Sequence, residues 1–207
     1  MTKVESSAQS GASAEATRAQ LLGRALVCGG AVLGGGLVAW GLPQLSAASP
    51  SAEQDKRVLN LVLAVEYVEA AFYKEALAGA GLQGEVADYA RVVAAHEQAH
   101  VDFLKKALGG AAEPEGSYDF GDATKDADAF AATAVELEDL AVSTYNGQAV
   151  NLTSPTLEAA ARIVSVEARH AAWIRSILGK VPATEPVDEA IKEADTRAKL
   201  REIAGTA

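Results

Sequence analysis

Cysteine is almost absent from this 207-residue chain, because Cys28 is the only one. A disulfide within the chain is therefore excluded, and so is a metal site built from several thiolates. Aromatic residues are also scarce, at 5% of the sequence. Alanine and leucine dominate the apolar residues, and this composition favours long helices over strands. Any metal site must use carboxylates and imidazoles, which suit iron, manganese or zinc.

Positive charge is scarce as well. The chain has 18 Lys and Arg residues against 28 Asp and Glu residues, for a formal net charge of −10. This balance argues against a nucleic-acid partner, whose phosphates attract basic patches. The first 50 residues carry Lys3, Arg18 and Arg24 against Glu5 and Glu15, a net of +1, so the remainder carries −10 − 1 = −11. The acidity belongs to the part of the chain that follows.

The N-terminal residues have the pattern of a targeting segment. Residues 1–20 are small and polar and are predicted to be disordered. Residues 21–45, "LLGRALVCGGAVLGGGLVAWGLPQL", are uncharged after Arg24 and precede the small residues "SAASPSA", as in an export signal. A retained membrane anchor is the alternative, and a buried helix is disfavoured by the glycines. Signal or anchor would place the rest of the chain outside the cytoplasm, as a periplasmic, secreted or membrane-anchored protein.

Beyond residue 50 the apolar pattern is helical. Ser51 followed by Gln54 fits a capping box, and Ser154 followed by Pro155 is a typical helix start. Glycines end several of the segments. The expected helices cover residues 51–79, 84–108, about 124–150 and 154–179, with a short charged helix at about 187–203.

The connections predict how the helices are wired. The first and third are short, so their flanking helices are expected to be antiparallel neighbours. The middle connection, "GGAAEPEGSYDFGDA", can extend to roughly 50 Å, and a helix of this length spans about 38 Å. It can therefore cross the whole bundle, which gives an all-α, ferritin-like four-helix bundle. The predicted organisation is an N-terminal segment at 1–50, the bundle at 51–180 and a charged C-terminal helix at 181–207.

The two halves of the bundle repeat one another. "EQAHVDFLKKALGG" aligns with "EARHAAWIRSILGK" at an offset of 70 residues, so that two Glu-x-x-His motifs coincide. "EYVEAAFY" and "EDLAVSTY" each place a tyrosine seven residues after a glutamate. The residues that these motifs single out are Glu66, Glu97, His100, Glu138, Glu167 and His170.

Helical spacing turns the repeat into a metal-site prediction. Residues three apart share a helix face, so each Glu-x-x-His pair can reach one ion. Four carboxylates and two imidazoles are the ligand set of dinuclear carboxylate bundles. Four negative charges cannot remain together in a low-dielectric core unless cations balance them, and two divalent cations would do so.

Residues 51–180 resemble the ferritin-like superfamily, in particular an exported bacterial branch that includes desiccation-related proteins. The similar stretches are "AVEYVEAAFY", "AAHEQAHVDFL", "LEDLAVSTY" and the "SYDF" of the crossover. The resemblance implies that Glu97 and Glu167 bridge two metals, that Glu66 and Glu138 are terminal ligands, and that each histidine binds one metal. It also implies two Fe(II) ions that react with dioxygen or peroxide; manganese or zinc would give a site without this chemistry. A non-enzymatic envelope stress protein with a structural metal or none is the alternative.

Several neighbouring residues have competing interpretations. Glu69 is the rival of Glu66, and Glu136 is the rival of Glu138; both fit the repeat less well. His96 lies about 100° around the helix from Glu97 and is expected at the surface or behind the ligands. Tyr73 and Tyr145 fit core residues with bonded hydroxyls or groups that shuttle electrons, and Phe72, Phe103 and Trp173 fit core packing.

Overall fold

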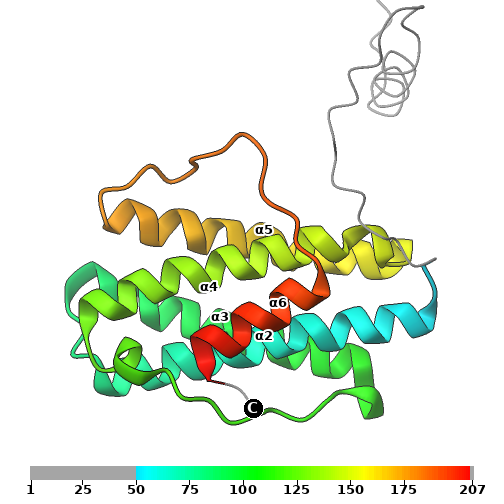
Figure 1. The fold of residues 1–207 in the computed structure, drawn as a ribbon, viewed down its shortest axis with the longest axis horizontal. Coiled ribbons are helices and arrows are strands. Elements are labelled where there is room, and N and C mark those ends of the chain that lie inside the picture. The colour runs from blue at the N-terminus through cyan, green and yellow to red at the C-terminus, as the bar shows by residue number, and fades with distance from the viewer. Residues whose placement is uncertain (1–49, 206–207) are drawn as a thin grey trace, which may run out of the picture. The chain divides into compact units, whose positions relative to one another are not determined.

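The computed structural model describes residues 50–205, and all regular structure in this range is helical (Figure 1). The prediction of an all-α bundle is confirmed. The N-terminal segment that the sequence marks as a signal or anchor lies outside the described residues, apart from its last position. The α-helices are α2 (Ala52–Gly79), α3 (Gly84–Leu108), α4 (Ala127–Gln148), α5 (Ser154–Ile177) and α6 (Glu193–Ala204), and the short 3-10 helices are η1 (Gly109–Ala111), η2 (Gly121–Thr124) and η3 (Ala149–Asn151).

None of the helices within residues 50–205 combines the length and the apolarity needed to cross a membrane.

Side-chain caps fix where two of the long helices begin. The Ser51 hydroxyl accepts a hydrogen bond from the Gln54 N–H at 3.1 Å, as the capping pattern predicts. The Asp126 carboxylate accepts from the N–H groups of Asp128 and Ala129 at 3.0 and 2.8 Å. This cap explains why α4 begins at Ala127, three residues after the expected start.

The crossover from α3 to α4 runs along the length of the bundle, so that α3 and α4 start at the same end (Figure 1). Asn60 on α2 holds its beginning: its amide donates to the Ala111 carbonyl and accepts from the Glu113 N–H, both at 2.9 Å. Near its other end the Asp119 N–H donates to the Ala204 carbonyl of α6 at 2.9 Å. The connection is therefore fixed at both ends, and the wiring is the one expected from the loop lengths.

Two apolar clusters fill the bundle, one towards each end. The first contains Phe72, Tyr89 and Phe130, and the second contains Val62, Leu104 and Ile163. On each long helix, the glutamates and histidines singled out by the repeat fall between residues of the first cluster and residues of the second. A polar layer therefore crosses the middle of the bundle and is sealed by apolar side chains on both sides.

The chain between α5 and α6 departs from the prediction. The last helix begins at Glu193 rather than near residue 187, and residues 178–192 form a strap that runs back over the bundle (Figure 1). The reason is a contact between distant segments: the Ile191 N–H donates to the Ser143 carbonyl of α4 at 3.1 Å. Ile191 is buried there, and α6 then packs on α4 and α2 through Thr196, Leu200 and Ala204.

Phe103 also differs from its prediction as a core residue. Its side chain is 42% exposed, whereas Phe72 is wholly buried. Phe103 lies six residues after the buried Glu97 on α3, about 120° around the helix from it, and this offset turns its side chain away from the bundle interior. Aromatic type alone did not distinguish the two positions.

The strap makes Gly147 a position where a side chain does not fit. A Cβ atom built on Gly147 would lie 1.8 Å from the Ile191 carbonyl oxygen. We expect Gly147→Ala to lower the free energy of unfolding by about 1–3 kcal/mol, the usual cost of overpacking, although alanine is the better helix former. Urea denaturation of the variant and the parent protein measures this difference.

Gly110→Ala is the matched control, because a Cβ there meets none of the described atoms within 4 Å. We expect this variant to be as stable as the parent protein. A Gly147→Ala protein that is equally stable would contradict the close approach of the strap.

Candidate metal centre

The structure brings the six side chains of the repeat together inside the bundle. Glu66 comes from α2, Glu138 from α4, and one Glu-x-x-His pair comes from each of α3 and α5. All four carboxylates are 0% exposed. The imidazole side chains are 13% exposed for His100 and 3% for His170. The polar layer is therefore an interior site reached from the histidine side.

The potential ligand atoms form two groups, within each of which all atoms lie within 4.8 Å of one another. This spread is close to that of ligands around one ion, since metal–ligand distances are about 2.0–2.2 Å. The cluster is therefore compact enough to bind a metal ion. The first group is Glu66, Glu97, His100 and Glu167; the second is Glu97, Glu138, Glu167 and His170.

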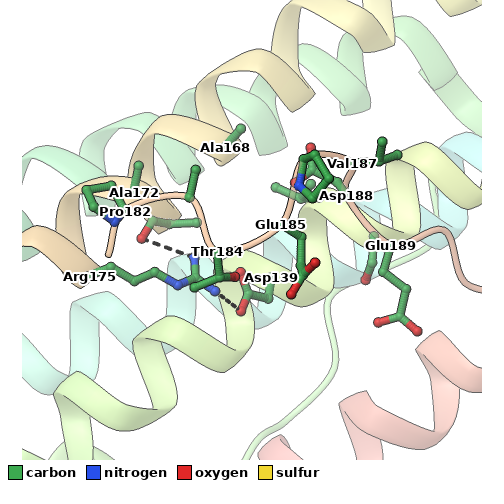
Figure 2. Close-up of a pocket in the computed structure, with 15 residues that line it drawn as sticks. Asp139, Ala168, Ala172, Arg175, Pro182, Thr184, Glu185, Val187, Asp188 and Glu189 are labelled. Carbon is green, nitrogen blue, oxygen red and sulfur yellow. Dashed lines mark hydrogen bonds and ion pairs between the residues drawn. The ribbon is translucent and has the colours of Figure 1, made fainter. Parts of the chain in front are cut away.

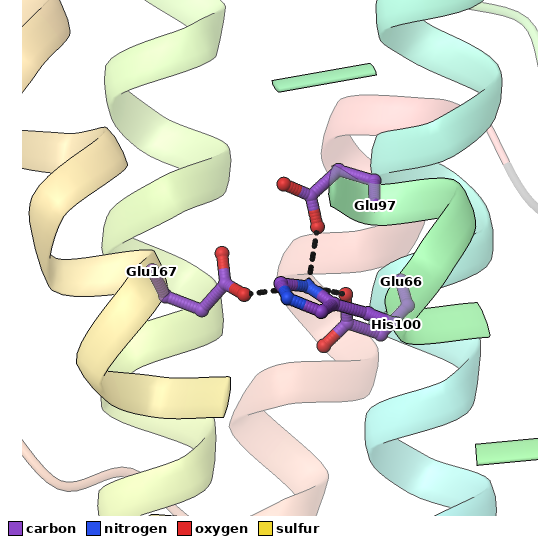
Figure 3. A group of neighbouring side chains, drawn as sticks. All are labelled: Glu66, Glu97, His100 and Glu167. Carbon is purple, nitrogen blue, oxygen red and sulfur yellow. Dashed lines mark hydrogen bonds and ion pairs between the residues drawn. The ribbon is translucent and has the colours of Figure 1, made fainter. Parts of the chain in front are cut away.

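In the first group, three carboxylates converge on one nitrogen (Figure 3). The Nδ1 atom of His100 lies 3.2 Å from Glu66 Oε2, 3.1 Å from Glu97 Oε2 and 2.9 Å from Glu167 Oε1. A single N–H group cannot point well at three acceptors. The three carboxylate oxygens and the imidazole nitrogen are arranged like ligand atoms directed at one common point.

The second group repeats this convergence. The Nδ1 atom of His170 lies 3.1 Å from Glu97 Oε1, 3.2 Å from Glu167 Oε2 and 3.4 Å from Glu138 Oε2. Glu97 and Glu167 therefore each direct one oxygen towards His100 and the other towards His170. The two groups are joined by these two shared carboxylates.

Unsatisfied oxygens test whether the site suits a cation. Glu97 Oε1, Glu138 Oε2 and Glu167 Oε1 are buried and make no hydrogen bond of good geometry; each only shares a histidine Nδ1 with other carboxylate oxygens, at 3.1, 3.4 and 2.9 Å. Buried carboxylate oxygens normally have partners, because desolvation without one is costly. All three belong to the groups described above. Their chemistry, and the lack of a donor that belongs to one of them alone, fit metal ligation.

The charges in this site are strongly perturbed. Burial raises the pKa of Glu66 well above its usual value, and repulsion from Glu167 adds to the shift. Burial likewise raises the pKa of Glu138 to about 8. Burial opposes a charged Glu97, but hydrogen bonds from His100 and His170 prevail and lower its pKa to about 2.

Both histidines hold protons strongly when no cation is present. Burial alone would lower their pKa values, but the carboxylates outweigh it. Hydrogen bonds to Glu167, Glu66 and Glu97 raise the pKa of His100 to about 12. Those to Glu138, Glu167 and Glu97 raise the pKa of His170 to about 12. A metal ion must displace these protons, so binding is expected to strengthen as pH rises.

Tyrosine hydroxyls hold the two unshared glutamates, and they do so across the halves of the repeat. Tyr145 on α4 donates to Glu66 Oε1 at 2.6 Å, and Tyr73 on α2 donates to Glu138 Oε1. Tyr73 also lies 2.8 Å from the hydroxyl of Tyr89. Burial and the adjacent carboxylates raise the pKa of both Tyr73 and Tyr145, so these hydroxyls stay protonated donors.

Tyr89 and the contact made by His96 were missed by sequence reasoning. Tyr89 donates to Glu138 Oε1 at 3.2 Å, and His96 Nδ1 lies 2.9 Å from His170 Nε2. Tyr89 precedes Glu97 by eight residues, an offset of about 80° around the helix, so spacing on α3 alone does not mark it as a neighbour of the ligands. The interpretation of His96 as a residue behind the ligands agrees with its position, but its partner on α5 could not be read from α3 alone.

The two rival glutamates have opposite environments. Glu136 is exposed and belongs to neither group. Glu69 is 0% exposed and lies beside the site, although it too belongs to neither group. Sequence spacing placed Glu69 close to the face of Glu66 but did not predict that both side chains would be buried.

A cavity of about 490 Å³ leads to the site from between α3 and α5. It is lined by all three histidines and by Val166, Arg169 and Trp173. A second cavity, of about 480 Å³, lies under the strap, beside the ion pair of Arg175 with Asp139 (Figure 2). None of the six side chains of the repeat lines it, so the first cavity is the one connected to the cluster.

These pKa shifts predict how the stability of the metal-free protein depends on pH. The raised pKa of Glu138 stabilises the fold at low pH, and this contribution is lost as pH rises from about 4.5 to 8. The raised pKa values of His100 and His170 act in the same direction, but their contribution is lost between about pH 6.5 and 12. The lowered pKa of Glu97 stabilises the fold above about pH 4.5, and this contribution is lost only as pH falls towards 2. A loss of about 2 kcal/mol would lower the melting temperature by roughly 4–8 °C. Calorimetry in the presence of a chelator measures it.

Glu138→Gln is the control for this prediction, because the amide has the same shape but does not titrate. We expect its melting temperature to fall less between pH 5 and 8. Rising stability of the metal-free parent protein over that interval would contradict the proposed origin of the effect.

The family model for the ferritin-like domain matches residues 54–180. No curated protein matches the chain. The family match covers more than half of the sequence and includes all six side chains of the cluster. Together with the helical wiring, it shows that this chain belongs to the ferritin-like domain family.

Proposed function

We propose that this protein holds two metal ions, most suitably iron, and uses them to oxidise Fe(II) or to reduce dioxygen or peroxide. One observation carries the proposal: Glu97 and Glu167 each direct one oxygen to the group of His100 and the other to the group of His170. Two carboxylates arranged in this way can bridge two ions. A single structural ion would not need two complete ligand groups.

The roles of the ligands follow from this sharing. Glu97 and Glu167 would bridge, Glu66 and Glu138 would each bind one ion, and each histidine would bind through Nδ1. Two divalent ions contribute +4, which balances the four carboxylates when both imidazoles are neutral. Carboxylate and imidazole ligands of this composition suit iron in four-helix bundles, and manganese or zinc could also bind.

When bound, two ferrous ions supply the two electrons that, with two protons, reduce peroxide to two molecules of water or dioxygen to peroxide. The residues of the chain provide the environment for this reaction. Tyr145, Tyr73 and Tyr89 fix the two unshared carboxylates through hydrogen bonds. The apolar clusters on both sides limit the access of water. The cavity beside the histidines is a route for a small oxidant.

The sequence pattern of residues 21–45 supports a location outside the cytoplasm, as in the desiccation-related branch that the chain resembles. We expect a fusion of residues 1–50 to an enzyme that is active only after export to give activity in a bacterial host. Replacing Leu37, Val38 and Ala39 by aspartate should abolish it, because charge disrupts an apolar export segment. Full activity of the substituted fusion would contradict an export role.

Metal content and oxidation rate test the central proposal. We expect the protein, loaded anaerobically with Fe(II), to bind two ions per chain and to oxidise them faster than buffer does after oxygen or peroxide is added. Glu97→Ala should lower the affinity for both ions, by roughly 10–100-fold or more, because it removes a shared ligand. Glu66→Ala should mainly lower the affinity for the ion in the group of His100. Elemental analysis and stopped-flow absorbance measure the two effects.

Glu136→Ala is the matched control, since it removes an exposed glutamate two residues from Glu138. It should retain both ions and the full rate. Two bound ions with only background oxidation would leave a structural metal site, as expected of a non-enzymatic stress protein. Fewer than two ions per chain, with Glu97→Ala unchanged, would reject the dinuclear site.

A further inference from the structure

The ligand sets of the two halves match, but three polar side chains that contact the ligands or lie buried beside them have no equivalent in the other half. The offset of 70 residues that relates His100 to His170 relates His96 to Val166 and Tyr89 to Ala159. The offset of 72 residues that relates Glu66 to Glu138 relates Glu69 to Ala141. The site therefore has two similar ligand groups in unequal surroundings.

Two of the three unmatched side chains contact the same ligand group. His96 Nδ1 lies 2.9 Å from His170 Nε2, and the two rings are stacked with centroids 5.1 Å apart. Tyr89 donates to Glu138 at 3.2 Å, in addition to the bond that Glu138 accepts from Tyr73. Such contacts orient the ligands and raise metal affinity. The group of Glu138 and His170 is thus the better supported of the two.

Glu69 is the third unmatched side chain, and its oxygens are without partners. It is 0% exposed, and neither Oε1 nor Oε2 accepts a hydrogen bond from the described residues. A carboxylate in this condition is costly unless a proton or a cation compensates it. Ala141, at the equivalent position on α4, is also 0% exposed, so the other half buries a methyl group there.

The position of Glu69 directs it to the group of Glu138 and His170. Glu69 lies on α2 one turn before Tyr73, which contacts Glu138. Glu69 therefore lies on α2 between Glu66 of the first group and Tyr73, which contacts Glu138 of the second, and from this position its carboxylate can turn towards the second group.

We propose that the two metal positions are unequal and that Glu69 is an additional carboxylate ligand of the position formed by Glu97, Glu138, Glu167 and His170. The inference rests on the proposed dinuclear site. Glu69 is outside the set of atoms within 4.8 Å, so its side chain must rotate to bring an oxygen to a bound cation. An added anionic oxygen increases the affinity for a hard divalent cation.

The consequence is that the two metal positions have different roles. The position with Glu69 keeps its ion. The position of Glu66 and His100 has fewer supporting contacts, and His100 is the more exposed of the two ligand histidines that line the cavity. The position of Glu66 and His100 therefore exchanges its ion, and Fe(II) enters as a substrate through this position.

Anaerobic titration of the full chain with Mn(II), followed by calorimetry and electron paramagnetic resonance, tests the inference. We expect two ions to bind with unequal affinities. Glu69→Gln should lower the affinity for the more tightly bound ion by at least roughly tenfold and leave the affinity for the other ion unchanged. Glu136→Gln, the matched surface control, should change neither. Equal weakening of both ions, or wild-type affinities in Glu69→Gln, would overturn the proposal.

Melting temperatures separate ligation from a structural role. Glu69→Gln removes a buried acid, so the metal-free variant should melt higher than the wild type, whereas the rise produced by Mn(II) should be smaller. A side chain that served only for packing would shift both states in the same direction, which would overturn the inference. Fewer than two ions bound by the wild type would reject the dinuclear site itself. Two ions bound, with Glu69→Gln unchanged, would reject only the role of Glu69.

Discussion

The burial of carboxylates in the middle of the bundle is the constraint on which the rest of the structure depends. Glu66, Glu69, Glu97, Glu138 and Glu167 are all 0% exposed and lie within one layer. Charges of one sign cannot stay together in a low-dielectric interior without compensation. Without a cation, protons on the two histidines supply part of it. A bound metal ion could supply more of it, and the compact arrangement of the carboxylates and imidazoles is suited to binding one.

The remainder of the bundle keeps this layer in place. Apolar clusters on either side fix the spacing of the four long helices, and the crossover fixes which ends coincide. Tyrosines of α2 and α4 each hold the glutamate of the other helix, so the two halves are interlocked at the site. Glu69, His96 and Tyr89 have no counterparts in the other half, so the two ligand groups lie in unequal surroundings within the same fold.

The fold and most of the cluster could be predicted because their signals are local and repeated. Helix boundaries follow from caps, glycines and the 3.6-residue period, and α3 lies where these signals place it. The start of α6 could not be predicted, since the Ile191 bond to Ser143 competes with helical bonding. Phe103 was assigned to the core by residue type, but its exposure depends on which way α3 faces.

The sequence by itself determined the ligand types, their pairing in Glu-x-x-His motifs and the match between the two halves. These properties depend on spacing along single helices, which the chemistry of the backbone fixes. Only the tertiary structure decided which oxygen faces which histidine, that Glu69 is buried without a partner, and that Tyr89 and His96 support the same ligand group. Such properties depend on distances between helices, and packing of the whole bundle sets those distances.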